Sequence, residues 1–301
     1  MRVIDPVTIT DAMLVSSTIS EPDTGEVAWN AATAYVVDDI VYRASLHRRY
    51  RRLVDGTTST APENDSTNWA YIGGTNKWAM FDDTSARSIE TSSPLTVVFE
   101  PGQINSMAIL GIAGDTLEIT ITDGDGGPTV YSRTIDLDTS VVADWYAYFF
   151  EPFSTRQVVV LTDIPPYPDS RVTVTLTGTG DVSIANCIVG TVYDLGVTVY
   201  GVNAGIRDYS RKTTDETTGV VTLVRRRFAK TLRARYYVTE GAINAVHTRL
   251  ESLRATPCVW LGGTDTTDID PLTVFGYLKD FNLELQQANA SYYSLEIEGM
   301  T

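Results

Sequence analysis

Short runs of alternating apolar and polar residues, separated by turn signals, constrain this 301-residue chain more than any other feature. Eight such runs lie between residues 95 and 189, and no helical period interrupts them. Strands of this length and spacing are typical of antiparallel sandwiches and jelly rolls. The sequence therefore predicts a mainly β protein. The predicted strands of this region are 95–99, 106–112, 117–122, 130–137, 145–149, 157–161, 171–178 and 182–189.

The last third of the chain combines long strands with a single helical pattern. Residues 206–212 and 220–238 are predicted to form the two sides of a long hairpin, joined by the polar connection 213–219. Thr239 can cap a helix directly after them. Pro257 is expected to end this helix, because the residue before a proline is pushed out of helical geometry. The apolar stripe of the helix is Ile243, Val246, Leu250 and Leu253, and further strands are predicted at 258–261, 275–285 and 292–297.

The first twenty residues alternate apolar and polar positions and are predicted to form one or two strands. Pro6 places the first of them at a sheet edge or a strand start, because proline lacks the N–H of the ladder. We expect both strands to join the sheet of the C-terminal domain, which makes that domain discontinuous. The predicted organisation is 1–20 together with 191–301, a small module at 28–74 and a β-sandwich insert at 76–190.

Four segments of the C-terminal third resemble the tube-type domain of tailed-phage tail proteins, most closely distal tail or baseplate proteins. They are residues 205–211 (GIRDYSR), 253–260 (LRATPCVW), 277–281 (YLKDF) and 294–299 (SLEIEG). The resemblance implies a tail-tube-like β-sandwich with one packed helix and a long hairpin. The alternative is an unrelated β-sandwich that carries one packed helix.

This resemblance implies a structural virion protein of the tail tip, made in the host cytoplasm and acting by assembly. Copies of the chain would close into a ring of six between the tail tube protein and the tip hub proteins, with DNA only as passing cargo. The inserted modules would stand at the periphery and present sugar-binding surfaces to host glycan. The alternative function is a carbohydrate-binding tail adhesin whose tube-like domain only anchors it.

Residues 29–73 resemble the small carbohydrate-binding modules attached to chitinases. The order of aromatic residues and of the segment around Tyr42 carries this likeness, although Asp38 replaces a glycine and Ala44 another. The likeness implies that exposed aromatic faces stack on sugar rings. The alternative is that a module of this size needs the same aromatic residues as its own core. The candidate sugar-binding residues are Trp29, Tyr42, Tyr50 and Trp69.

Within the insert, residues 78–82 (WAMFD) and 145–152 (WYAYFFEP) resemble a recurrent tail-protein insert of galactose-binding-like form. In that architecture, sugars bind to loops at one end of the sandwich. The resemblance therefore adds a second candidate region for sugar binding, without naming individual residues for it.

The net charge of −15 argues against a protein that wraps nucleic acid, because phosphate binding needs a surplus of Lys and Arg. Two basic clusters stand out against this acidity, at 43–52 and 225–235. Each could pair with an acidic neighbour or simply face solvent as a strand edge. In the second cluster, Phe228, Leu232, Ala234 and Tyr236 suit a core face. The candidate interface residues are Arg227, Arg233 and Arg235, with Asp208, Asp215 and Glu216 on the hairpin of the adjacent subunit.

Catalytic and cofactor motifs are not found in the sequence. It contains no nucleophile elbow, no phosphate-binding P-loop and no zinc-protease helix motif. His47 lies among arginines and His247 on the predicted helix, so we expect no metal site. The segment Asp123–Gly127 is predicted to be a tight hairpin turn rather than a calcium loop. The expectation is a protein without enzymatic activity, cofactor, disulfide, signal peptide or membrane span.

Overall fold

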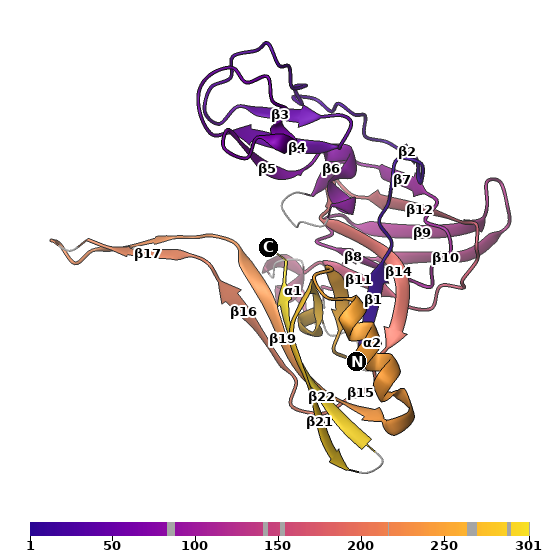
Figure 1. Ribbon diagram of the computed structural model, residues 1–301. Coiled ribbons are helices and arrows are strands. Elements are labelled where there is room, and N and C mark those ends of the chain that lie inside the picture. Colours follow the sequence, from indigo (N-terminus) through magenta and orange to yellow (C-terminus); the bar gives the residue numbers. More distant parts are fainter. Residues whose placement is uncertain are drawn as a thin grey trace. The chain divides into compact units, whose positions relative to one another are not determined.

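The computed structural model describes residues 1–82, 88–140, 144–150, 154–215, 217–263, 270–287 and 290–300 (Figure 1). The fold is mainly β, with 50% strand and 11% helix, and combines curled antiparallel sheets with one short packed helix. This confirms the predicted fold class. No helix within these ranges is long and apolar enough to cross a membrane. The chain divides into two compact units: unit 1, Met1–Pro6 with Val189–Thr301, and unit 2, Val7–Ile188.

Unit 1 is built on one antiparallel sheet. Its strand order is β14-β1-β20-β21-β22-β19, and β15 and β16 both pair with β19. The first strand of the chain joins this sheet, with Val3 opposite both Tyr193 of β14 and Trp260 of β20. The elements are β1 (Arg2–Pro6), β14 (Asn186–Asp194), β15 (Val197–Thr198), β16 (Asn203–Asp208), β17 (Arg211–Thr214), β18 (Val221–Val224), β19 (Phe228–Thr239), η3 (Glu240–Ala242), α2 (Ile243–Ser252), β20 (Cys258–Leu261), η4 (Asp270–Leu272), β21 (Thr273–Gln287) and β22 (Ala290–Gly299).

The core of unit 1 lies between the sheet and α2. Val246, Leu250 and Leu253 of the predicted apolar stripe belong to the same buried cluster as Tyr236 and Trp260. Burial of each large side chain contributes about 1.5–3 kcal/mol, so this cluster is a main source of the unit's stability.

The ends of α2 differ from the prediction. Thr239 makes no side-chain cap hydrogen bond, and a 3₁₀ turn precedes the helix. The helix ends at Ser252, before it reaches Pro257, and Ala255 adopts a φ of 60° in the connection that follows. The end of the helix and the left-handed residue therefore both precede Pro257.

The predicted long hairpin forms in two parts. Near the sheet, β16 pairs with the first half of β19, from Asn203 opposite Arg233 to Asp208 opposite Phe228. Farther out, β17 and β18 pair with each other as a separate two-stranded sheet. We call residues 203–228 the arm, which extends away from the sheet of unit 1 in Figure 1.

Most of the predicted sandwich strands lie in unit 2, whereas the predicted strand 182–189 divides into β13 and the start of β14. One sheet has the order β10-β9-β12-β7-β2, and β11 with β8 and β13 with β6 form further antiparallel pairs. The strand β6 was not predicted. The sandwich elements are β2 (Leu14–Ser17), β6 (Ile89–Ser92), β7 (Leu95–Phe99), β8 (Ser106–Leu110), β9 (Thr116–Asp123), β10 (Thr129–Asp136), α1 (Trp145–Phe150), β11 (Val158–Leu161), β12 (Ser170–Thr177) and β13 (Asp181–Ile184).

The turn between β9 and β10 is a hairpin connection, as predicted for residues 123–127. Gly124 and Gly126 have φ values of 73° and 67°, a region that glycine reaches without steric cost.

The small module forms a three-stranded antiparallel sheet in the order β3-β4-β5. Its buried cluster is Tyr35, Val41, Tyr50 and Trp69. Its elements are β3 (Ile40–Arg43), β4 (Arg48–Arg52), η1 (Pro62–Asn64) and β5 (Trp69–Gly74), followed by the 3₁₀ helix η2 (Asn76–Phe81).

Only the first of the two N-terminal strands belongs to unit 1, which corrects the prediction for residues 1–20. The chain turns after Pro6, where the Leu14 N–H donates to the Thr10 carbonyl. Leu14 then lies opposite Phe99, so β2 extends the sandwich sheet of unit 2. An alternating pattern gives the face of a strand but not the sheet that it joins.

Residues 145–149 were predicted as a strand and form the helix α1 instead. Helical spacing brings Trp145 against Phe149 and Tyr146 against Phe150, with ring centroids 6.2 and 5.1 Å apart. The run contains no polar residue, so its periodicity could not distinguish a strand from a helix.

Candidate functional site

The four aromatic residues predicted to bind sugar lie in or around the core of the small module. Trp69, Tyr50 and Tyr42 are buried, with 2%, 4% and 8% of their surface exposed. Trp29 packs against the same cluster, and the Arg43 guanidinium lies 5.0 Å from its ring centroid. Sugar stacking needs an open aromatic face. The three buried side chains therefore fit the alternative interpretation, in which they belong to the core of the module.

The arginines of residues 43–52 do not form one open cationic patch. Arg52 is 2% exposed, and its guanidinium donates to the carbonyl oxygens of Val54 and Gly56. Arg43 donates to Glu63 over 2.9 Å. These two side chains hold the loops of the module in place.

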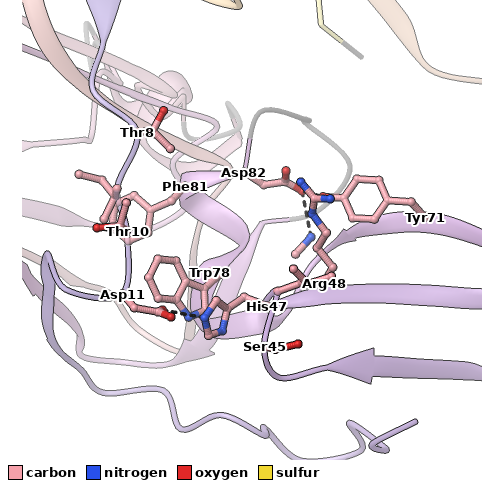
Figure 2. A pocket seen from close by; sticks show the side chains of 13 residues that line it. Thr8, Thr10, Asp11, Ser45, His47, Arg48, Tyr71, Trp78, Phe81 and Asp82 are labelled. Atoms are coloured by element: carbon pink, nitrogen blue, oxygen red, sulfur yellow. Dashed lines mark hydrogen bonds and ion pairs between the residues drawn. The ribbon is translucent and has the colours of Figure 1, made fainter. Parts of the chain in front are cut away.

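A cavity of about 270 Å³ opens in unit 2 (Figure 2). The small module contributes one wall, and the segments before and after it contribute the others. The lining consists of residues 8–11 and 45–48 together with Tyr71, Gly74, Trp78, Phe81 and Asp82. In Figure 2, His47 and Trp78 lie at one end, and Arg48 and Asp82 lie at the other. We call this cavity the pocket.

His47 occupies the floor of the pocket among carboxylates, and not among arginines as the sequence suggested. Its Nε2 lies 2.6 Å from Asp11 Oδ1, and its Nδ1 lies 2.7 Å from Glu21 Oε2. Its ring stacks on Trp78, with centroids 4.4 Å apart and planes at 25°. Asp11 and Glu21 are far from His47 in the sequence, so no local pattern predicts this cluster.

The opposite end of the pocket combines an aromatic ring, a carboxylate and a guanidinium. Asp82 Oδ2 accepts hydrogen bonds from the Tyr71 hydroxyl over 2.5 Å and from the Gly74 N–H over 2.9 Å. The guanidinium of Arg48 lies 5.3 Å from the centroid of the Tyr71 ring. Tyr71 is 39% exposed, which leaves part of its surface accessible.

The arm of unit 1 exposes an unusual amount of apolar surface. All eight residues of β17 and β18 are exposed. A two-stranded ribbon without a core is at best marginally stable in water, and clustered exposed apolar residues mark interaction sites. The large apolar side chains exposed on the arm are Ile206, Tyr209, Val220, Val221, Leu223, Val224 and Phe228.

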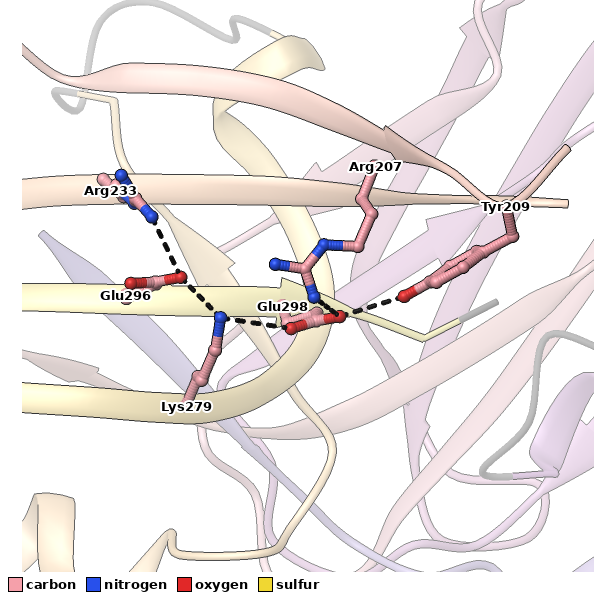
Figure 3. A network of polar contacts seen from close by, with 6 residues as sticks. All are labelled: Arg207, Tyr209, Arg233, Lys279, Glu296 and Glu298. Carbon is pink, nitrogen blue, oxygen red and sulfur yellow. Dashed lines mark hydrogen bonds and ion pairs between the residues drawn. The ribbon is translucent and has the colours of Figure 1, made fainter.

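The root of the arm is fixed to the sheet through Glu298, only 7% of whose surface is exposed (Figure 3). Arg207 and the Tyr209 hydroxyl both donate to Glu298 Oε1, over 2.6 and 2.9 Å. Lys279 lies 3.7 Å from Glu298 Oε2 and donates to Glu296 over 2.8 Å. The network joins β16 to β21 and β22 and so sets the direction in which the arm leaves the sheet.

Two of the predicted interface residues are already paired within their own sheet. Arg233 lies 3.3 Å from Glu296, and Arg235 lies 2.6 Å from Glu284. The guanidinium of Arg235 also lies 4.5 Å from the centroid of the Tyr292 ring. Both arginines remain exposed and line an open groove of about 440 Å³ in unit 1.

The other predicted interface residues lie on the arm. Asp208 accepts from the Ser210 N–H over 2.8 Å, and hydrogen bonds from Ser210 lower the pKa of this carboxyl. Arg227 is exposed beside the start of β19, and its carbonyl accepts from the Tyr209 N–H. Asp215 accepts from the Thr217 and Thr218 N–H groups in the terminal turn. Glu216 lies outside the described residues.

Sequence reasoning missed α1 as an exposed aromatic surface. Trp145 and Phe150 are 80% and 71% exposed. The loop that carries α1 is closed by a bridge between Asp138 and Thr155 and by a 2.8 Å hydrogen bond from the Arg156 N–H to the Leu137 carbonyl. The sequence feature that could have indicated this exposed surface was the run of aromatic residues without a charged side chain.

The two cysteines are buried thiols. Burial raises the pKa of Cys187 and of Cys258 to about 12. A thiol with such a pKa stays protonated at neutral pH and is a poor nucleophile.

No protein-family model matches this chain, and no curated protein matches its sequence.

Proposed function

We propose that this chain is a structural protein of a phage tail tip that assembles with copies of itself through the arm. The observation that carries the proposal is the β17–β18 ribbon, a separate two-stranded sheet in which all eight strand residues are exposed and which has no further strand among the described residues. A neighbouring subunit would supply the surface that this ribbon lacks. In this proposal the chain acts by binding and performs no catalytic step.

The distribution of charge favours a second copy of the chain as the partner that covers the ribbon. Residues 203–228 contain six arginine or lysine residues and three acidic ones, whereas the whole chain has a net charge of −15. The arm is therefore cationic, and the remainder of any other copy is strongly acidic. Opposite charges of this kind steer association and fix its register.

The fixed root of the arm supports the same proposal. An arm whose direction is set by Glu298 before assembly loses less conformational freedom on binding than a loose one. Repetition of one head-to-tail contact closes into a ring when the rotation between subunits divides a full turn. On the basis of the resemblance to distal tail proteins, we propose that the ring has six copies and binds the tail tube protein and the tip hub proteins in the virion. DNA is then only passing cargo.

The mass of the purified protein, measured by light scattering over a range of concentrations, tests the proposal together with negative-stain images. We expect a closed ring for the native chain and a monomer for Leu223→Asp. Val36→Asp is the matched control, because it adds the same charge at an exposed apolar residue of the small module. A native chain that is monomeric at every concentration, or a Leu223→Asp variant that still forms rings, would contradict arm-mediated assembly.

The second candidate function is a carbohydrate-binding tail adhesin that attaches the virion to host glycan. The pocket in unit 2 is the observation that favours it, because this cavity combines aromatic, acidic and basic side chains. This function does not require a ring.

A further inference from the structure

The floor of the pocket is held in place before any ligand enters. Glu21 accepts hydrogen bonds from the Thr75 hydroxyl over 2.8 Å and from the Trp78 Nε1–H over 3.1 Å, and it contacts His47. Thr75 in turn donates its backbone N–H to the His47 carbonyl. A floor with this many contacts retains its shape without a ligand, which lowers the entropic cost of binding.

The backbone at His47 supports the same conclusion. His47 has a φ of 53°, in the left-handed region that residues other than glycine rarely occupy. This conformation is unfavourable for a residue with a Cβ atom and persists only where surrounding contacts hold it. Here those contacts are the two carboxylates and the Trp78 ring. These contacts therefore keep a planar polar ring in the pocket lining.

The groups around the opening can act on a ligand in three ways. Asp11, whose side chain is 70% exposed, and Asp82 offer carboxylate oxygens that accept hydrogen bonds. The Arg48 guanidinium offers several N–H donors. Tyr71 is 39% exposed and offers C–H groups the part of its ring that the Arg48 guanidinium, 5.3 Å from the ring centroid, leaves uncovered.

This combination selects among ligand classes. An anionic ligand would face the two carboxylates of a strongly acidic protein, with one guanidinium to balance them. A purely apolar ligand would displace water from the charged groups without replacing the hydrogen bonds of that water. A neutral ligand with adjacent hydroxyl groups on one edge and C–H groups on a face satisfies all three kinds of group.

We propose that the pocket binds one sugar unit of a neutral saccharide, with Asp11, Arg48 and Asp82 bonding its hydroxyl groups and Tyr71 contacting its C–H face. This site differs from the aromatic residues of the module core, which the sequence suggested. It is argued from unit 2 alone and does not depend on assembly through the arm.

Saturation-transfer NMR on the full chain tests the proposal, with neutral hexose and N-acetylhexosamine oligosaccharides as probes. Sialic acid and glucosamine serve as the anionic and cationic comparisons. We expect signals from a neutral probe only. Arg48→Ala and Asp11→Ala should each weaken its affinity about tenfold or more, since hydrogen bonds to charged groups contribute about 1.5–3 kcal/mol.

Arg51→Ala is the matched control, because Arg51 lies on the same strand as Arg48 and is absent from the pocket lining. We expect its affinity to stay within about twofold of the native chain. No signal from any neutral probe, equal affinity in Arg48→Ala and the native chain, or preference for sialic acid or glucosamine would each overturn the proposal. The Leu223→Asp variant should bind the same probe, so failure of assembly and failure of sugar binding are distinguishable.

Discussion

The two halves of the long hairpin in unit 1 have the same antiparallel pairing but different surroundings. In the inner half, all six residues of β16 are exposed, but β19 places Ala229 and Leu232 in the core, each 0% exposed. In the outer half, β17 and β18 bury none of their residues. The inner half therefore contributes to the folding of its own unit, and the outer half is available for contacts with other molecules. The two roles can be separated by mutation.

The largest expected effect is on Leu232, which is fully buried. Leu232→Ala should lower the free energy of unfolding of unit 1 by about 2–5 kcal/mol, because it removes apolar contacts and leaves a cavity. Hydrogen exchange of β19 and β22 amides during urea titration measures this change. The same substitution at Leu223, on the outer half, should change stability by less than about 0.5 kcal/mol. Equal effects at the two positions would remove the distinction between the halves.

An intermediate effect is expected where the two halves meet. Glu298→Gln removes the charge that faces Arg207 and Lys279 and should cost about 1–3 kcal/mol at the root of the arm. Amide exchange of residues 203–210 should rise more than exchange elsewhere in unit 1. Glu284→Gln, at a more exposed carboxylate that pairs with Arg235, is the control and should change exchange much less. If amide exchange of residues 203–210 rose no more than exchange elsewhere in unit 1 in both variants, Glu298 would not hold the arm.

The smallest expected effect concerns pH. Hydrogen bonds from Lys279 and Arg233 lower the pKa of Glu296 below its ordinary value of 4.5. Because the pKa is lower in the folded state, the ionised carboxylate stabilises unit 1 at neutral pH. This contribution is lost as the pH falls from about 4.5 through the folded-state pKa. Unfolding curves at decreasing pH should therefore have a shallower pH dependence in Glu296→Gln, and an unchanged slope would contradict this assignment.

Much of the fold could be predicted because local patterns and tertiary packing agree. The alternation in β19 correctly placed Leu232, Ala234 and Tyr236 inward and Arg233 and Arg235 outward. The pattern was wrong at Phe228, which is 49% exposed. Phe228 pairs with Asp208 at the root of the arm, where the buried position passes to Ala229. Periodicity predicts burial only where a core exists to receive the side chain.

The candidate site was less predictable from the sequence, because its parts are far apart in the chain. The cluster of Asp11, Glu21, His47 and Trp78 depends on how the small module packs on segments before and after it. Trp69 and Tyr50 were sugar-binding candidates because the sequence gives the residue type but not whether a ring face is covered. In the structure both side chains are buried.

The pairing of β1 has a consequence for the order of events during synthesis. Ribosomes make β1 before all of unit 2, yet the residues that pair with it, 190–194 of β14 and 259–261 of β20, follow that unit in the chain. Domains generally fold as units while the chain is made. Unit 2 can thus complete its sandwich while β1 still has two open edges. Closing that long connection is entropically costly and slow, so formation of the unit 1 sheet is expected to limit the rate at which the newly made chain completes its folding.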